Sequence, residues 1–319
     1  MLYDIVDGFF DGVRRTNVLS TALNLGLFQY TISPMSVEAL SRELDVDVGM
    51  FSTVCNILVS MGLLEKNYGG YVNTAASDLY LVRESPYCMI TTIRNRIDHV
   101  SKWKRLEEAL HKGGIETDDP FFTEDWISGI GESSKGGPIA ETVSTVESSI
   151  DMSEIGSFLD MGGGHGLYAV GFKHRHPRMK CSLFDQECIV PVAEKNFKEY
   201  GVDIDIQKGN FYKDPVKGRF DVVFSSYNRS GMDPKMAPIV LDLLNMDGYL
   251  IIRKPITSVF KNPVHILEHS IIKRKNPLNS AEPGGFDEYV SYMRKNGVAL
   301  ESREDLNGDT ELLIFRRTG

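Results

Sequence analysis

A run of glycines follows a short apolar segment in the middle of the chain. Phe158-Leu159-Asp160-Met161 leads into Gly162-Gly163-Gly164-His165-Gly166, after which the pattern becomes helical. Glycines allow a tight backbone turn and let a ligand approach the main chain more closely than any side chain would permit. Asp185 ends the next predicted strand, where a carboxylate can accept hydrogen bonds from both hydroxyls of a ribose. Together they indicate an adenosine-type nucleotide site at the carboxyl edge of a sheet.

The type of nucleotide depends on Asp160. Gly164–Ala169 also satisfies the pattern G-x-G-x-x-A, with Asp185 about 20 residues on, as a dinucleotide site requires. Asp160, however, stands two residues before the first glycine, where its carboxylate would stabilise an ammonium group and repel a pyrophosphate. S-adenosylmethionine carries an ammonium and a sulfonium, so these residues favour it. A dinucleotide and a purely structural glycine turn remain as alternatives.

The elements that position these residues alternate between strands and helices from Ser157 onward. This alternation predicts an α/β domain with a mostly parallel sheet covered by helices on both faces. The last two strands are expected to form a closing hairpin. The predicted segments are strands at Ser157–Met161, Lys180–Phe184, Asp203–Gln207, Phe220–Ser225, Tyr249–Arg253, Val298–Ser302 and Glu311–Phe315, and helices ending at His174, Tyr200 and Asn245.

The first 112 residues show apolar residues at helical spacing and little strand-type alternation. Ser36 is a candidate N-cap, Gly49 separates a second helix that ends near Gly62, and a small hairpin follows, which is a winged-helix order. One amphipathic helix is predicted through Ile97, Val100, Trp103 and Leu106. Loops rich in Gly, Asp and Ser, at Gly113–Pro120 and Gly129–Pro138, are read as a hinge. We therefore predict a helical domain over residues 1–112 and a cofactor domain over 113–319.

The composition excludes several other classes. The chain has 319 residues, a net charge of -9 and 42% hydrophobic residues, as expected of a globular protein with a sizeable core. Its four cysteines form no C-x-x-C pair, so neither a disulfide scaffold nor a thiolate zinc site is indicated. No basic start precedes an apolar run, and no 18 consecutive apolar residues occur. We expect a cytoplasmic protein that binds no membrane.

With these motifs the chain resembles the S-adenosylmethionine-dependent O-methyltransferases that carry an N-terminal winged-helix dimerisation domain, typified by plant caffeate and acetylserotonin enzymes. The resemblance implies a Rossmann-like, seven-stranded class I methyltransferase domain, and a homodimer formed through the N-terminal domain. It covers nearly the whole chain. The segments that carry it are Ala22–Phe28, Val37–Ser41, Leu58–Leu64, Leu159–Gly166, Gly209-Asn210-Phe211 and Asp247–Ile252.

The same resemblance implies which residues bind the cofactor. Asp160, Gly162 and Gly164 would line the methionine part, and Asp185 would bind the ribose. The remaining implied contacts are Gln186 beside the ribose, Asn210 and Phe211 at the adenine, and Ser226 and Tyr227 after the fourth strand. The family usually has aspartate where this chain has Asn210, but an amide oxygen can still accept from the adenine amino group.

The catalytic segment departs from the family. Ser230 and Gly231 stand where the family carries a histidine that takes the proton from the substrate hydroxyl, followed by an aspartate. Deprotonating a phenol of pKa about 10 at pH 7 costs about 4 kcal/mol without a base. The chain therefore uses another base, methylates an acceptor that is already nucleophilic, or has lost methyl transfer.

Three residues are candidates for the missing chemistry. His265 and His269 lie four apart on a predicted helix, so both imidazoles share one face. Together with Glu268 they match a zinc-peptidase pattern, but no second acidic helix follows, and we predict no metal. The histidines then serve as a pocket base or form an exposed polar face. Arg229 could clamp an anionic substrate or form a surface salt bridge.

The winged-helix pattern also raises the possibility of a DNA-binding sensor of small molecules. Residues 1–80 contain four basic and nine acidic residues, and Gly49–Gly62, the would-be recognition helix, has no Lys or Arg. Phosphate contacts could not form there, so no nucleic-acid partner is expected. We predict methyl transfer from S-adenosylmethionine to a small molecule, at a hydroxyl oxygen. The alternative is a family member with a non-methylating reaction or a carbon, nitrogen or sulfur acceptor.

Overall fold

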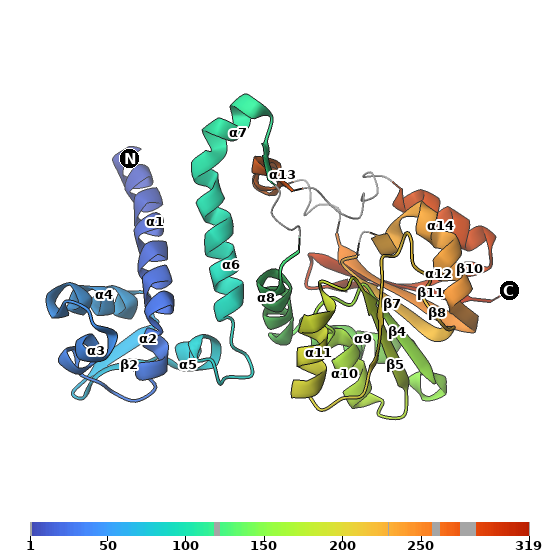
Figure 1. The fold of residues 1–319 in the computed structure, drawn as a ribbon, viewed down its shortest axis with the longest axis horizontal. Coiled ribbons are helices and arrows are strands. Elements are labelled where there is room, and N and C mark those ends of the chain that lie inside the picture. Colours follow the sequence, from blue (N-terminus) through green and yellow to red (C-terminus); the bar gives the residue numbers. More distant parts are fainter. Residues whose placement is uncertain (1, 118–121, 229, 257–261, 275–284, 319) are drawn as a thin grey trace. The chain divides into compact units, whose positions relative to one another are not determined.

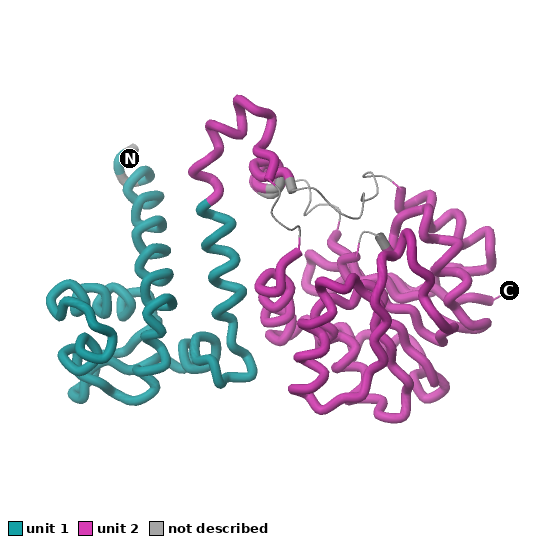
Figure 2. The backbone as a smooth tube through the Cα atoms, viewed as in Figure 1, with its two compact units in different colours: residues 1–101 teal, residues 102–319 magenta. Residues whose placement is uncertain are grey.

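The structure is a computed structural model that describes residues 2–117, 122–228, 230–256, 262–274 and 285–318. The chain divides into two compact units, Met1–Ser101 and Lys102–Gly319 (Figure 2). Each unit has its own hydrophobic core. Among the described residues, no helix has both the length and the apolar character that a membrane crossing would need.

The first unit consists of helices and one small hairpin, as the sequence predicts. Its core contains buried side chains of the first helices and of the hairpin, including Leu23, Phe28, Leu58 and Tyr71. The elements are α1 (Leu2–Leu25), α2 (Leu27–Tyr30), α3 (Val37–Leu44), α4 (Val48–Ser60), β1 (Leu64–Asn67), β2 (Gly70–Asn73), α5 (Ala75–Leu81) and α6 (Ile90–Ser101).

Side-chain caps fix where two of these helices begin. Ser36 Oγ accepts from the backbone N–H of Ala39 at 3.3 Å, which confirms the predicted cap of α3. The next helix, predicted to end near Gly62, ends at Ser60, but the predicted separation at Gly49 is wrong, because Gly49 lies inside the first turn of α4. Asp47 is the actual cap, and its Oδ1 accepts from the N–H of Met50 at 2.8 Å.

The second unit contains the α/β domain (Figure 1). Its elements before the sheet are η1 (Lys102–Arg105), α7 (Leu106–Lys112), β3 (Ile115–Thr117), α8 (Glu124–Lys135), α9 (Pro138–Ser149) and η2 (Met152–Glu154). Those of the sheet and its coverings are β4 (Ser157–Met161), α10 (Leu167–Arg175), β5 (Lys180–Asp185), α11 (Val190–Glu199), β6 (Asp205–Lys208), β7 (Phe220–Ser226), η3 (Ser230–Met232), η4 (Pro234–Met236), α12 (Ala237–Leu243), β8 (Leu244–Pro255), α13 (Pro263–Ile271), β9 (Ile272–Arg274), α14 (Phe286–Lys295), β10 (Val298–Leu306) and β11 (Thr310–Arg317).

One seven-stranded sheet forms the centre of this unit, in the order β10-β11-β8-β7-β4-β5-β6. The five strands from β8 to β6 are parallel, and β10 and β11 close the sheet as an antiparallel hairpin. The predicted Rossmann-like architecture and closing hairpin are thus confirmed. Separate apolar clusters fill the two faces, one including Phe158 and Ile251 and the other including Leu159 and Ile252.

Three predicted segments differ from the structure. The helix expected through Ile97–Leu106 is interrupted at η1, because Ile97 packs in the core of the first unit whereas Trp103 and Leu106 pack in a separate cluster. The helix predicted to end at Asn245 ends at Leu243, and β8 begins directly at Leu244. The third difference concerns the predicted hinge.

Residues 129–135 were predicted as a loop and instead belong to α8. Thr123 caps this helix, since its Oγ1 accepts from the N–H of Trp126 at 3.1 Å. Gly129 and Gly131 are buried on it. A Cβ on Gly131 would lie 3.1 Å from the Cβ of His165, so this glycine allows close packing against the glycine turn. The hinge predicted from these glycines is therefore wrong for residues 129–135, which are helical.

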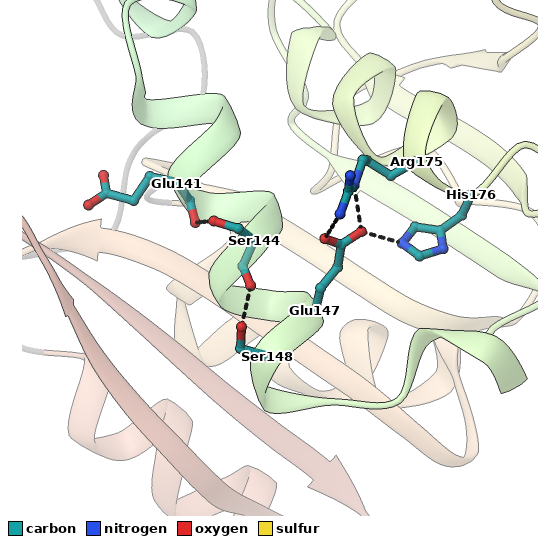
Figure 3. Close-up of polar contacts among 6 residues, drawn as sticks. All are labelled: Glu141, Ser144, Glu147, Ser148, Arg175 and His176. Atoms are coloured by element: carbon teal, nitrogen blue, oxygen red, sulfur yellow. Dashed lines mark hydrogen bonds and ion pairs between the residues drawn. The ribbon is translucent and has the colours of Figure 1, made fainter.

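An ion-pair cluster joins the end of α10 to α9 (Figure 3). Glu147 Oε2 lies 2.8 Å from Nη2 of Arg175, and Oε1 lies 2.9 Å from Nε2 of His176. The hydrogen bond from Arg175 is the main reason that the pKa of Glu147 is lowered. His176 is the C-cap residue of α10. The cluster fixes α10, whose other end carries the glycine turn.

Candidate functional site

Three glycines with positive φ shape the turn between β4 and α10. Gly162, Gly164 and Gly166 have φ values of 71°, 56° and 71°. This left-handed region is readily adopted only by glycine. The turn is closed by hydrogen bonds from the N–H of Gly162 to the carbonyl of Phe184 and from the N–H of Gly166 to that of Gly163, both 2.8 Å. The sequence therefore specifies this turn through its glycines.

These glycines differ in how much free space lies beside each of them. A Cβ on Gly162 would lie 2.3 Å from Nδ2 of Asn228, and one on Gly166 would lie 2.6 Å from the ring of Phe197. Beside Gly164 the nearest atom would be Cγ2 of Ile127, at 4.0 Å. Protein atoms therefore pack against the first and last glycine, whereas the surface at Gly164 is open to a ligand.

Asp160 is a buried carboxylate with an unsatisfied oxygen. Its side chain lies at the end of β4, the residue is 1% exposed, and Oδ2 has no hydrogen-bond partner among the described residues. The pKa of Asp160 is raised to about 8, mainly by burial and further by the charge of Asp185, against a hydrogen bond from the backbone of Ala169. A buried polar atom without a partner is costly, so this oxygen is suited to a cationic ligand.

Asp185 connects the glycine turn to the neighbouring strand. It ends β5, and its Oδ2 accepts from the N–H of Gly164 at 2.8 Å while its Oδ1 accepts from the N–H of Gln186 at 2.7 Å. Burial raises the pKa of Asp185 to about 6, although both hydrogen bonds lower it. Each carboxylate oxygen retains a further lone pair, so the side chain can still accept from two hydroxyls.

A cavity of about 590 Å³ opens beyond Asp185, with Gln186 and Asn210 among its lining residues. Asn210 Oδ1 accepts from the N–H of Tyr212 at 2.9 Å. Phe211 is buried and packs against Phe184, with ring centroids 4.8 Å apart. Of the two predicted adenine residues, Asn210 lines this cavity, whereas Phe211 is a core residue and is not among the lining residues.

The strand end after β7 holds the last predicted cofactor contacts. Ser226 ends the strand, and Tyr227 has a strained φ of 51°. The Tyr227 N–H donates to the carbonyl of Arg253 at 2.8 Å, and its hydroxyl lies 2.7 Å from Oγ1 of Thr310. Non-glycine residues in this backbone region are uncommon and often occur at functional sites.

His165, within the turn, is buried and not available as a base near neutral pH. Its Nδ1 accepts from the N–H of Leu167 at 3.1 Å. The pKa of His165 is lowered to about 4, first by burial and then by the positive charges of Arg253 and Lys135. The imidazole is therefore neutral and helps to hold the start of α10.

The structure describes the predicted catalytic candidates only in part. Arg229 lies outside the described residues. His265 and His269 lie on α13, as expected, but their side chains are also outside the described part of the chain. Their assignment stays a prediction.

The segment that replaces the family's histidine and aspartate begins with Ser230, whose backbone lies in η3. A Cβ on the next residue, Gly231, would lie 2.5 Å from Oγ of Ser225 and 2.9 Å from Cε of Met161. An acidic side chain at position 231 would therefore require the side chains of Ser225 and Met161 to shift.

Sequence reasoning missed Arg253, at the carboxyl end of β8. This arginine is 8% exposed, and its guanidinium lies over the rings of Tyr168 and Tyr227, at 5.4 and 4.9 Å. It could have been noticed as the first charge after the apolar run Leu250–Ile252.

Comparisons with known proteins agree with the fold. Residues 8–83 match the model of the O-methyltransferase dimerisation domain, and residues 115–226 match that of the O-methyltransferase domain. The second match ends just before the segment that contains Ser230 and Gly231.

Similar proteins include methyltransferases of bacterial and human origin. The N,N-dimethyltransferase OxyT of Streptomyces rimosus is 23% identical over 92% of this chain and 90% of its own length. Human acetylserotonin O-methyltransferase is 27% identical over 67% of this chain and 68% of its own. The structure of the human N-acetylserotonin enzyme in complex with SAM superposes with a TM-score of 0.75 at 18% identity, covering 100% of this chain and 98% of the other.

The parallel sheet, the glycine turn and the family matches define a Rossmann-like methyltransferase. More narrowly, the chain belongs to the O-methyltransferase family whose members carry an N-terminal dimerisation domain. Its activity is methyl transfer.

Proposed function

We propose that this methyltransferase uses S-adenosylmethionine to methylate a small molecule, most simply at a hydroxyl oxygen. The observation that carries the proposal is the unpartnered, buried oxygen of Asp160 at the glycine turn, which also has an open surface at Gly164. When bound, the cofactor supplies a methyl group on a positively charged sulfur.

The described residues fit such a cofactor part by part. Asp160 would bind its ammonium, and the backbone at Gly162 and Gly164 would lie against the methionine part. Asp185 would accept from the ribose hydroxyls, Gln186 and Asn210 line the cavity where adenine would lie, and the buried Phe211 is next to Asn210 in the sequence. Ser226 and Tyr227 complete the proposed contacts. By excluding water and holding the acceptor close to the methyl group, the chain would provide most of the rate acceleration.

Asp185→Ala is expected to weaken the binding of S-adenosylhomocysteine at least about tenfold, because charge-assisted hydrogen bonds contribute roughly 1.5–3 kcal/mol. Isothermal titration calorimetry measures the change. Asp205→Ala, which removes an exposed carboxylate from the neighbouring β6, serves as the control. No binding by the wild-type protein, or equal binding by Asp185→Ala, would contradict the proposal.

Cofactor binding is also expected to release close to one proton at pH 7. The pKa of about 8 means that most Asp160 side chains hold a proton before binding, and an ammonium partner lowers that pKa. Calorimetric enthalpies of S-adenosylhomocysteine binding should therefore differ between phosphate and Tris buffers. Identical enthalpies in both buffers would argue that Asp160 does not meet the ammonium.

The acceptor atom has a second candidate, an amine nitrogen. An amine with a free lone pair needs no base, which would suit a chain that has Ser230-Gly231 in place of the family's histidine and aspartate. The similarity to OxyT, an N,N-dimethyltransferase, supports the same possibility. Incubation with methyl-labelled cofactor and candidate phenols or amines, followed by mass spectrometry, distinguishes an O-methyl from an N-methyl product.

The proposed assembly is a homodimer formed through the first unit. Its matched dimerisation domain includes most of α1, on which large apolar side chains are exposed. Phe9 is 70%, Phe10 54% and Val13 58% exposed. A contiguous apolar surface of this kind is typical of a protein interface, and sedimentation analysis would measure the assembly.

A further inference from the structure

Arg253 is a buried cation without an acidic partner. Its Nε has no hydrogen-bond partner, and no carboxylate of the described residues pairs with its guanidinium. Neighbouring cations differ in this respect, since Lys254 and Arg303 both pair with Glu311. A guanidinium is always charged, and burying it without a counter-ion is unfavourable. The two tyrosine rings compensate only part of this cost, because cation–π contacts contribute about 1–2 kcal/mol.

The position of Arg253 places this charge at the proposed cofactor site. Arg253 pairs in register with Ser226, at the carboxyl end of β7. Tyr168, which lies against the guanidinium, belongs to the first turn of α10, directly after the glycine turn. The positive charge of Arg253 also contributes to the lowered pKa of His165 within that turn.

Asp160 and Arg253 lie on the same face of the sheet. Asp160 pairs with Phe224, which pairs with Ile251, and Arg253 follows two residues later on β8. With strands about 4.8 Å apart and a rise of about 3.3 Å per residue, the two backbone positions are roughly 12 Å apart. Asp160 and Arg253 therefore present a negative and a positive group on one face of the sheet, which is the arrangement that a ligand with opposite charges at its ends requires.

We propose that Arg253 binds a carboxylate in this site, so that Asp160 and Arg253 together form a receptor for a zwitterionic amino-acid group. The planar guanidinium matches a carboxylate in a bidentate arrangement. A phosphate dianion is a poorer occupant, because Asp160 and Asp185 lie on the same edge of the sheet. The inference rests on the proposed function, and the carboxylate belongs either to the methionine part of the cofactor or to an acidic acceptor.

The test compares two adenosine compounds and two substitutions by calorimetry. S-adenosylhomocysteine carries the amino-acid group, whereas 5′-deoxy-5′-methylthioadenosine lacks it. Arg253→Met removes the charge and keeps the aliphatic stem, and Arg253→Lys keeps the charge without the fork. Lys135→Met is the matched control, since Lys135 also lowers the pKa of His165 but lies over the ring of Tyr200. Circular dichroism melts confirm that each variant is folded.

If the carboxylate is that of the cofactor, Arg253→Met weakens S-adenosylhomocysteine binding about 10- to 100-fold and leaves methylthioadenosine binding unchanged. Arg253→Lys then falls between the wild type and Arg253→Met, and Lys135→Met binds like the wild type. If the carboxylate is that of the acceptor, S-adenosylhomocysteine binding stays unchanged. In that case the saturated Arg253→Met protein loses the wild-type preference for 4-hydroxybenzoate over neutral 4-hydroxybenzamide.

Three results would overturn the inference. The first is that Arg253→Met behaves like the wild type both in binding the adenosine compounds and in its preference between the two phenols. The second is that it weakens both adenosine compounds equally, as expected of a purely structural arginine. The third is that Lys135→Met causes the same loss as Arg253→Met, which would indicate a general electrostatic effect. A wild-type protein that binds neither adenosine compound would instead overturn the proposed function.

Discussion

Asp160→Asn is expected to make the ligand-free protein more stable while it weakens S-adenosylhomocysteine binding about 10- to 100-fold. The wild-type carboxylate is buried and leaves one oxygen unpartnered, which favours its protonated form and raises its pKa to about 8. One pKa unit corresponds to about 1.4 kcal/mol. An asparagine removes this ionisation cost but also has an unsatisfied polar atom, so we expect a net gain of roughly 2 kcal/mol at pH 8.

The pH dependence follows from the direction of the shift. Between about pH 4 and pH 8 the folded wild type holds a proton on Asp160 that the unfolded chain has released. The contribution of this group to stability therefore falls as the pH rises through that window. The melting temperature of Asp160→Asn should exceed that of the wild type by little at pH 5 and by on the order of 5 °C at pH 8.

Asp221→Asn provides the matched control. Burial acts to raise the pKa of Asp221, but hydrogen bonds from Asn245, Ser157 and Gly156 outweigh it and lower that pKa. The same substitution should therefore reduce stability and leave cofactor binding intact. A lower melting temperature for Asp160→Asn at pH 8, or unchanged binding, would contradict the proposed function of Asp160.

Alanine substitutions at Gly164 and Gly166 should differ in their main effect, which is on cofactor binding at Gly164 and on stability at Gly166. Both Gly164 and Gly166 have positive φ, so alanine costs roughly 1–2 kcal/mol of backbone strain at either position. At Gly166 the new Cβ would also lie 2.6 Å from the ring of Phe197, so we expect a loss of stability of about 3 kcal/mol or more. At Gly164 the Cβ enters open space, and the added methyl group would occupy the surface proposed to contact the cofactor.

Gly164→Ala should therefore fold with a modest loss of stability and bind S-adenosylhomocysteine at least about tenfold more weakly. Gly166→Ala should show the larger loss of stability. Chemical denaturation measures stability, and titration of the folded variants measures affinity. Wild-type affinity in Gly164→Ala would show that the open surface is not part of the cofactor site.

The sheet could be predicted from the sequence because short, partly apolar segments alternate with helical patterns. Ser157–Met161 and Lys180–Phe184 are of this kind, and both lie in strands. Glycines, by contrast, do not predict a single kind of local structure. The glycines after Met161 specify a turn, but Gly129 and Gly131 lie within α8, and at Gly131 the absence of a side chain allows close packing.

The candidate site could be predicted only in part. The sequence indicates that Asp160 and Asp185 stand at strand ends, but it does not show which carboxylate oxygens the chain satisfies itself. Asp185 accepts two backbone hydrogen bonds, whereas one oxygen of Asp160 has no partner among the described residues. Arg253 was missed because its importance depends on two tyrosines, Tyr168 and Tyr227, that are far from it in sequence and adjacent in the fold.

The crowding around Gly231 sets a condition for engineering the catalytic segment. An added Cβ would lie 2.5 Å from Oγ of Ser225 and 2.9 Å from Cε of Met161, so an aspartate at this position would require both side chains to move. Installing a histidine-aspartate pair at positions 230 and 231 would therefore also require repacking of these two neighbours.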